Sequence, residues 1–172
     1  MDALPKRSLG LRSALIAATL AWLAFSRFGS PSPAEEAKDL GRQVPLEILA
    51  PYKGKVVLVN LFATWCGPCI AEIPDLVRLQ NGHPDLAVVG LQVMDIGGEP
   101  LPAFRARLGI NYPTIDANDN LEVEKAFGAP DVLPMSYILD RDGRIVATLT
   151  GRTSFEEFER RLALYFRVAS SL

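Results

Sequence analysis

Two near-continuous apolar runs dominate the pattern of hydrophobic and polar positions along the chain. They cover residues 56–62 and 86–93, and neither shows the alternation of a strand with one wet face. Short runs of this kind are typical of strands buried on both faces of a sheet. Two further strands are predicted at 136–140 and 145–149, because the intervening Asp140-Arg141-Asp142-Gly143 indicates a hairpin turn.

Helical segments alternate with these strands. We predict helices at 67–80, 101–108, 120–127 and 154–168, and a short extended piece at 112–115. Gly109 and Gly128 are helix stops, and Ser154 or Thr153 is the N-cap of the last helix. Strands that alternate with helices predict an α/β sandwich with a partly parallel sheet.

The N-terminal segment differs in kind from the rest. Lys6, Arg7 and Arg12 precede an uncharged run at 13–26, and a breaker-rich stretch follows. This order is typical of an export signal. As a helix, the 14 residues of the run would measure about 21 Å, short of the roughly 30 Å hydrocarbon core, although flanking arginines can snorkel.

A cleaved signal peptide and an N-terminal membrane anchor therefore both stay open for this segment. In either case the basic flank stays inside, and the rest of the chain is predicted to be periplasmic or otherwise extracytoplasmic. We expect the signal or anchor at 1–29, a linker at 30–41 and one domain at 42–172. That last length suffices for a domain with its own core.

Charge adds little to this picture. The formal net charge of the 172 residues is −2, and the charged side chains are scattered. We therefore expect no nucleic acid as a partner, and a monomeric soluble domain.

Both cysteines lie in Trp65-Cys66-Gly67-Pro68-Cys69, between the first predicted strand and the first predicted helix. Their spacing puts them on one side of a helical turn, close enough for a disulfide. Cys66 is at the helix N-terminus, where free N–H groups and the helix dipole stabilise a thiolate. Pro68 suits the first turn, and Gly67 leaves room for another backbone. We assign Cys66 as the attacking thiol and Cys69 as the resolving thiol of disulfide exchange.

Other uses of two cysteines fit the sequence less well. A structural zinc site needs four ligands, and His83 is the only histidine. A purely structural disulfide here would close a very short loop, where the entropic gain is small. Haem attachment requires a histidine directly after the second cysteine, where Ile70 stands. We therefore expect redox exchange without a metal or cofactor.

Two blocks carry a family resemblance. Residues 57–74 are similar to the active-site stretch of the TlpA/ResA/CcmG group of the thioredoxin superfamily, and 133–145 resemble that group's Pro-x-Ser-x-x-Ile-Asp-x-x-Gly strand and turn. The resemblance implies a thioredoxin fold with a helix–strand insertion at about 100–116. It also implies that Pro134 is the cis-proline packed against the cysteines. The backbone of Leu133 would then bind an extended substrate segment, as in strand addition.

The same resemblance implies an exported thiol–disulfide oxidoreductase. Its substrate would be an oxidised cysteine pair on an exported protein, with apocytochrome c as the candidate. Electrons would come from a membrane thiol carrier of the CcdA/DsbD type. Gly-Pro between the cysteines favours a reductase, since thioredoxin, with the same pair, is reducing at about −270 mV against about −120 mV for DsbA. A thiol peroxidase on the same fold and a non-catalytic peptide-binding assembly factor are the alternatives.

Three more side chains are candidates for the site. Glu72 follows Cys69 by three residues and is a candidate to exchange a proton with it, or else a solvated helix glutamate. Asn60 stands where cytosolic thioredoxins carry a buried aspartate. An amide cannot relay a proton, which favours Glu72 for that role. Trp65 is either an apolar platform for a partner or a core aromatic.

Overall fold

The computed structural model describes residues 40–44, 47–128 and 130–166. The signal or anchor predicted at 1–29 and nearly all of the linker predicted at 30–41 lie outside these ranges. Within them, no helix combines the length and the apolar character that crossing a membrane requires.

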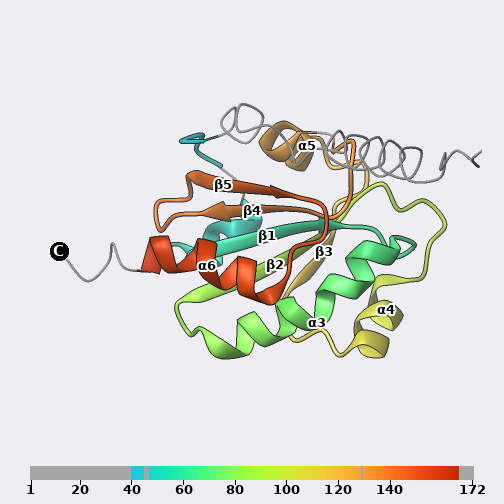
Figure 1. Ribbon diagram of the computed structural model, residues 1–172. Helices are drawn as coiled ribbons and strands as arrows, with labels where there is room; N and C mark the ends of the chain where they lie inside the picture. The colour runs from blue at the N-terminus through green and yellow to red at the C-terminus, as the bar shows by residue number, and fades with distance from the viewer. Residues whose placement is uncertain (1–39, 45–46, 129, 167–172) are drawn as a thin grey trace, which may run out of the picture. The chain divides into compact units, whose positions relative to one another are not determined.

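The described domain is built on a five-stranded mixed sheet in the order β3-β2-β1-β4-β5 (Figure 1). Strands β1, β2 and β3 run parallel to one another, whereas β4 is antiparallel to both β1 and β5. The strands are β1 (Val56–Phe62), β2 (Leu86–Gln92), β3 (Thr114–Asp116), β4 (Met135–Leu139) and β5 (Ile145–Thr150). The predicted partly parallel sheet is confirmed.

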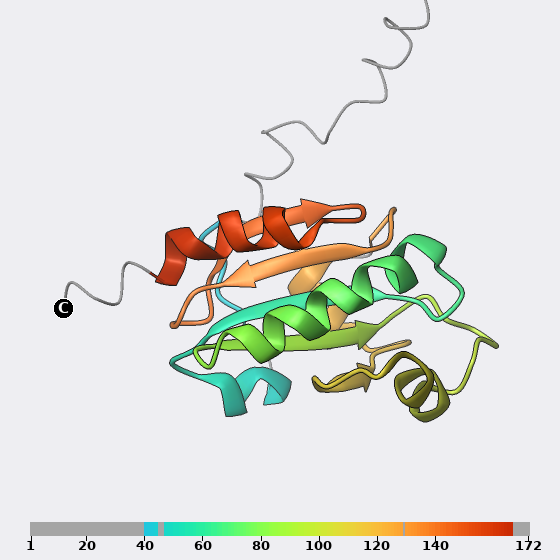
Figure 2. The same cartoon turned by 60° about the horizontal axis from the view of Figure 1, so that its bottom comes forward.

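Helices cover both faces of this sheet. They are the 3₁₀ helix η1 (Glu47–Tyr52) and the α-helices α3 (Gly67–Gly82), α4 (Leu101–Leu108), α5 (Leu121–Phe127) and α6 (Phe155–Phe166). Figure 2 shows α3 and α6 on the same face. Leu58 packs into the core under α3 and α6, and its neighbour Val59 into a second core with α5. Every residue of β1 and β2 is buried, as their apolar runs predict.

The predicted elements are all present, and no end differs by more than two residues. Both ends of β3 differ, since it is predicted at 112–115 and found at Thr114–Asp116. Its ladder to β2 begins at Thr114, directly after Pro113, which has no N–H to donate. Together α4 and β3 fill the predicted insertion, and β3 becomes an edge strand beside β2.

The topology brings three connecting segments together at one end of the sheet, where the parallel strands β1 and β2 terminate. These two strands lead into the cysteine segment and into residues 93–98. Because β4 is antiparallel to β1, it starts at this end, where Leu61 pairs with Met135. The segment that ends in Pro134 therefore enters beside the end of β1. The cysteines, the 93–98 loop and Pro134 come from distant parts of the sequence.

Candidate active site

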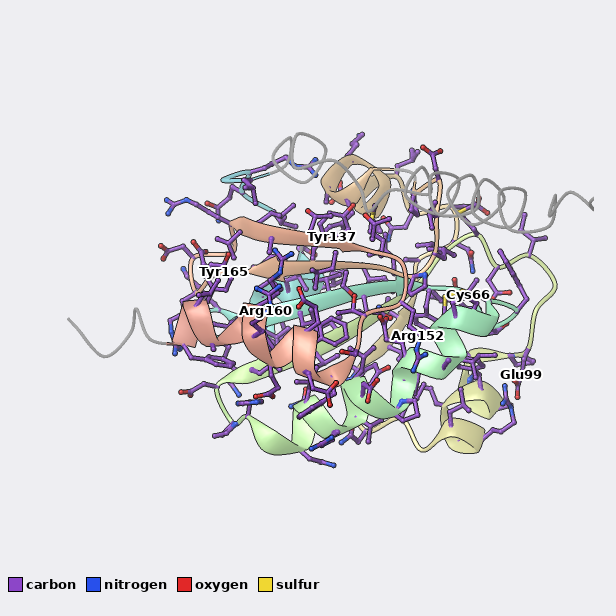
Figure 3. All side chains as sticks on the ribbon, in the orientation of Figure 1. Cys66, Glu99, Tyr137, Arg152, Arg160 and Tyr165 are labelled. Atoms are coloured by element: carbon purple, nitrogen blue, oxygen red, sulfur yellow. A yellow bond between two sulfur atoms is a disulfide. The ribbon has the colours of Figure 1, made fainter. Side chains whose placement is uncertain are left out.

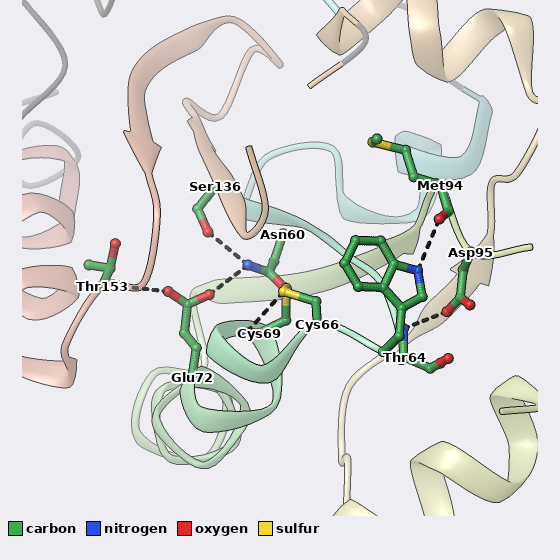
Figure 4. Close-up of a disulfide and its surroundings, with 10 residues drawn as sticks. Asn60, Thr64, Cys66, Cys69, Glu72, Met94, Asp95, Ser136 and Thr153 are labelled. Atoms are coloured by element: carbon green, nitrogen blue, oxygen red, sulfur yellow. Dashed lines mark hydrogen bonds between the residues drawn. A yellow bond between two sulfur atoms is a disulfide. The ribbon is translucent and has the colours of Figure 1, made fainter. Parts of the chain in front are cut away.

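Cys66 and Cys69 form a disulfide with a Cα–Cα distance of 5.2 Å. Cys66 is the N-cap of α3, and its sulfur accepts a hydrogen bond of 3.2 Å from the backbone N–H of Cys69 (Figures 3 and 4). Both residues are buried, but Cys66 is 4% exposed and Cys69 only 1%. The helix N-terminus thus already directs an N–H group at the sulfur of Cys66, which favours negative charge there.

The surface over the first turn of α3 is open. Gly67 and Pro68 are both exposed, and a side chain added at Gly67 would meet nothing within 4 Å. Pro68 lies in the first turn, where its missing N–H leaves no helical bond unmade. A partner backbone can therefore approach the disulfide from this side.

The Leu133–Pro134 peptide bond is cis, as the resemblance implies. Pro134 is buried, and its carbonyl accepts a 2.8 Å hydrogen bond from the N–H of Gly151. Leu133 is partly buried and packs against the cores on both faces of the sheet. This segment is thus fixed at the end of the sheet where the cysteines lie.

Glu72 is fully buried, which excludes the alternative of a solvated helix glutamate. One carboxylate oxygen accepts a 2.6 Å hydrogen bond from the N–H of Thr153, and the other a 2.8 Å bond from the side-chain amide of Asn60 (Figure 4). The same amide nitrogen donates to Ser136 at 3.0 Å. Asn60 and Ser136 are paired across β1 and β4.

The surroundings of Glu72 shift its protonation. Burial raises the pKa of Glu72 from 4.5 to about 7, although the hydrogen bonds from Thr153 and Asn60 act in the opposite direction. Asp75 adds to the increase, and Arg152 reduces it. Glu72 is therefore a carboxyl group that can gain or lose a proton near neutral pH.

Tyr112 is the other buried titratable group near Glu72. Burial raises the pKa of Tyr112, and the charge of Glu72 raises it further. The phenol is therefore uncharged at neutral pH. Of these two groups, Glu72 is the one that titrates near pH 7.

Trp65 is not a core aromatic. Its side chain is 59% exposed, and the indole N–H donates a 3.1 Å hydrogen bond to the carbonyl oxygen of Met94. The ring is therefore held in place at the surface next to Cys66, and its use as an apolar platform for a partner stays a prediction.

Asp95 is a residue of the site that the sequence analysis missed. It is buried and accepts hydrogen bonds from the backbone N–H of Thr64 and, at 2.9 Å, from the side chain of Gln92. Burial raises the pKa of Asp95, but the hydrogen bonds from Thr64 and Gln92 outweigh this and hold it below its ordinary value. The available signal was an acidic residue two positions after the buried strand predicted at 86–93, at the end of the sheet where Cys66 also lies.

Two side-chain arrangements bear on peroxidase and metal chemistry. Arg78, the arginine nearest in sequence for a peroxidase, places its guanidinium over the ring of Phe155, with Cζ 3.6 Å from the centroid. In the part of the chain that the structure describes, no three His, Cys, Asp or Glu side chains are grouped to hold a metal ion.

The chain is similar to known thiol–disulfide oxidoreductases. The thiol-disulfide oxidoreductase ResA of Geobacillus thermodenitrificans is 31% identical over 140 residues, which cover 78% of this chain and 75% of that protein. A thiol:disulfide interchange protein of the thioredoxin family from Chlorobium tepidum superposes with a TM-score of 0.59 at 33% identity, covering 68% of this chain and 83% of that one. A secreted thiol-disulfide isomerase from Corynebacterium glutamicum gives 0.59 at 25%, covering 65% and 71%.

The mixed sheet, the redox cysteine pair at a helix N-terminus and these relatives define the class of protein. It is a thiol–disulfide oxidoreductase with a thioredoxin fold, similar to the TlpA/ResA/CcmG group. The chain belongs to the Redoxin family, whose model matches residues 29–162.

Proposed function

We propose that the protein is an exported reductase of disulfides on other exported proteins, acting in the maturation of c-type cytochromes. The observation that carries the proposal is the asymmetry of the two sulfurs. Cys66 occupies the N-cap of α3 and is the more exposed cysteine, whereas Cys69 is enclosed. The Gly67-Pro68 pair, with no histidine between the cysteines, favours the reducing direction.

The reaction begins with the reduced cysteine pair. The Cys66 thiolate attacks one sulfur of the substrate disulfide, forms a mixed disulfide and releases the other substrate sulfur as a thiolate, which takes up a proton. Cys69 then loses its proton and attacks the sulfur of Cys66. This step releases the second substrate thiolate and forms the Cys66–Cys69 disulfide. Two electrons pass from the enzyme to the substrate.

Glu72 is the group that we propose to accept the proton of Cys69. It follows Cys69 by one turn of α3, and a pKa of about 7 lets it take up and release a proton at working pH. Asn60 lacks a titratable proton but holds the carboxylate in place through the 2.8 Å bond.

The substrate segment would lie over the exposed turn of α3. Trp65, Gly67 and Pro68 are accessible there, and Leu133 with the cis-bonded Pro134 would offer backbone groups to an extended chain. A disulfide-bearing segment on these residues would present a sulfur to Cys66.

Export is supported by the basic and then apolar order of residues 1–29 and by a relative described as secreted. We propose that these residues direct or anchor a domain at 42–172 outside the cytoplasm, with 30–41 as a linker. Outside the cytoplasm the oxidised enzyme needs a source of electrons, and a membrane thiol carrier of the CcdA/DsbD type would supply it.

Two experiments test the proposal. A Cys69→Ala variant should accumulate a mixed disulfide that a mass spectrum locates on Cys66, since no second thiol can resolve it. A Cys66→Ser variant is the matched control and should carry no adduct there. Redox titration of the purified protein against glutathione then tests the direction. A potential near that of DsbA would make it an oxidant, and absence of the Cys66 adduct would contradict the mechanism.

A further inference from the structure

We propose that Trp65, Met94 and Ile96 form an apolar recognition surface that binds an apolar side chain next to the cysteine of the client protein. The proposal rests on the proposed function, since it names what the exchange site recognises. These three residues are called the apolar lip below.

The lip gathers exposed apolar side chains from two loops. Trp65 is 59% exposed, Met94 52% and Ile96 93%. Single exposed apolar residues are common on protein surfaces and need no function. These three differ because the hydrogen bond from the indole of Trp65 to Met94 joins the two loops. Trp65 directly precedes Cys66 in the chain, so this hydrogen bond fixes the two loops next to the redox cysteine.

The loop that carries Met94 and Ile96 is held in position by hydrogen bonds of Asp95, the residue between them. The buried Asp95 carboxylate accepts hydrogen bonds from Thr64 and Gln92. The N–H of Asp95 donates to the side chain of Asn118 at 2.8 Å. Met94 itself has φ of 54°, a left-handed conformation that residues other than glycine seldom adopt. This arrangement keeps an apolar side chain at the surface on each side of the buried Asp95.

A hollow of about 200 Å³ lies beside the lip. Met94 and Ile96 line it on one side, and Ala117, Val123 and Pro130 contribute further apolar surface. For comparison, a buried apolar cavity of about 150 Å³ is large enough to bind benzene. The hollow therefore has room for one large aliphatic or aromatic side chain.

The position and the charge of the hollow indicate which side chain of the client protein would enter it. Trp65 directly precedes Cys66 and is 59% exposed, so we expect a protein whose disulfide reaches Cys66 to contact Trp65 as well. Among the described residues that line the hollow, Asp119 is the one with a charged side chain. A client residue with a carboxylate would be repelled there, whereas an apolar one would be accepted. The client segment is therefore expected to carry an apolar residue beside its cysteine.

Single-turnover kinetics test this. The dithiothreitol-reduced, desalted full-length protein is mixed with one of two disulfide peptides, identical except for leucine or glutamate next to the cysteine. The readout is the ratio of the second-order rate constants for the two peptides. We expect a ratio of about 10 for the wild type, the effect of partly burying one leucine side chain. We expect a ratio near 1 for Ile96→Ser, which removes the apolar side chain without adding a charge that would itself repel the glutamate peptide. Ile96 is 93% exposed, so its replacement should leave the fold intact.

The matched control is Leu164→Ser, on the surface of α6, where Leu164 is 59% exposed. It makes the same kind of replacement away from the lip and should keep the wild-type ratio. Equal rates for the two peptides in the wild type, or an unchanged ratio in Ile96→Ser, would overturn the lip but leave the exchange mechanism standing. A dimer that Ile96→Ser dissociates in sedimentation would also overturn it. If the wild type reduced neither peptide nor glutathione disulfide, the proposed function itself would fail.

Discussion

Replacing Glu72 by glutamine removes a titrating carboxyl group from a buried position where the charged form is unfavourable. Glu72 is fully buried, and burial is the main reason that its pKa is raised from 4.5 to about 7. The unfolded chain loses this proton at lower pH than the native state does. Stability contributed by the protonated form is therefore present below pH 4.5 and is lost as the pH rises to about 7.

The size of the effect follows from the two pKa values. Each pH unit between them changes the free energy of unfolding by about 1.4 kcal/mol. The full penalty of the ionised carboxylate above pH 7 is about 3 kcal/mol, of which about 2.5 kcal/mol develops between pH 5 and pH 8. The new glutamine can still accept from the N–H of Thr153, and the amide of Asn60 can turn to accept from it. We therefore expect Glu72→Gln to lack this pH dependence.

The assay is urea unfolding of the oxidised protein, followed by circular dichroism at intervals from pH 5 to pH 8. The stability of the wild type should fall by about 2.5 kcal/mol more than that of Glu72→Gln over this range. Other titrating groups, Asp95 among them, are present in both proteins and cancel in the difference. Glu122→Gln, an exposed change on α5, should follow the wild type. Parallel curves for wild type and Glu72→Gln would refute the argument that burial controls this proton.

Two further predictions concern a close contact at Gly98 and a buried hydrogen bond of Tyr137. Gly98→Ala should lower stability by about 1–3 kcal/mol in thermal unfolding, because the new methyl group would overlap the Asp95 carboxylate and the Thr64 hydroxyl. Gly82→Ala, with nothing within 4 Å of its added carbon, is the control, and equal losses in both would contradict this reasoning. Tyr137→Phe should cost about 1–3 kcal/mol in urea unfolding, since its hydroxyl donates a 2.6 Å hydrogen bond to a buried backbone carbonyl. A change below about 0.5 kcal/mol would show that this carbonyl finds another partner.

Much of the fold was predictable because its signals are local. The apolar runs of β1 and β2 identify strands buried on both faces, and their ends were placed within one residue. Gly109 adopts φ of 63° after α4, the conformation for which the glycine was read as a helix stop. The bounds of β3 were less predictable, because a three-residue edge strand is defined by its hydrogen bonds to β2 rather than by its own side chains.

In the site, too, the features that depend on neighbouring residues were predictable and those that depend on distant residues were not. The cysteine spacing and the preceding strand were enough to predict the disulfide, because both sulfurs belong to one helical turn. The burial of Glu72 was not predictable, since its partners Asn60 and Thr153 come from β1 and from the segment before α6. Asp95 was missed because its role depends on Thr64, 31 residues away.

The amino-acid sequence by itself determined which segments become strands and helices and which two sulfurs can join, because periodicity and a three-residue spacing act over a single turn or strand. The tertiary structure alone decided the proton affinity of Glu72 and the placement of Met94 and Ile96 beside Trp65. Those properties arise where β1, β2 and β4 meet at one end of the sheet, since desolvation and hydrogen bonding depend on neighbours that only folding brings together.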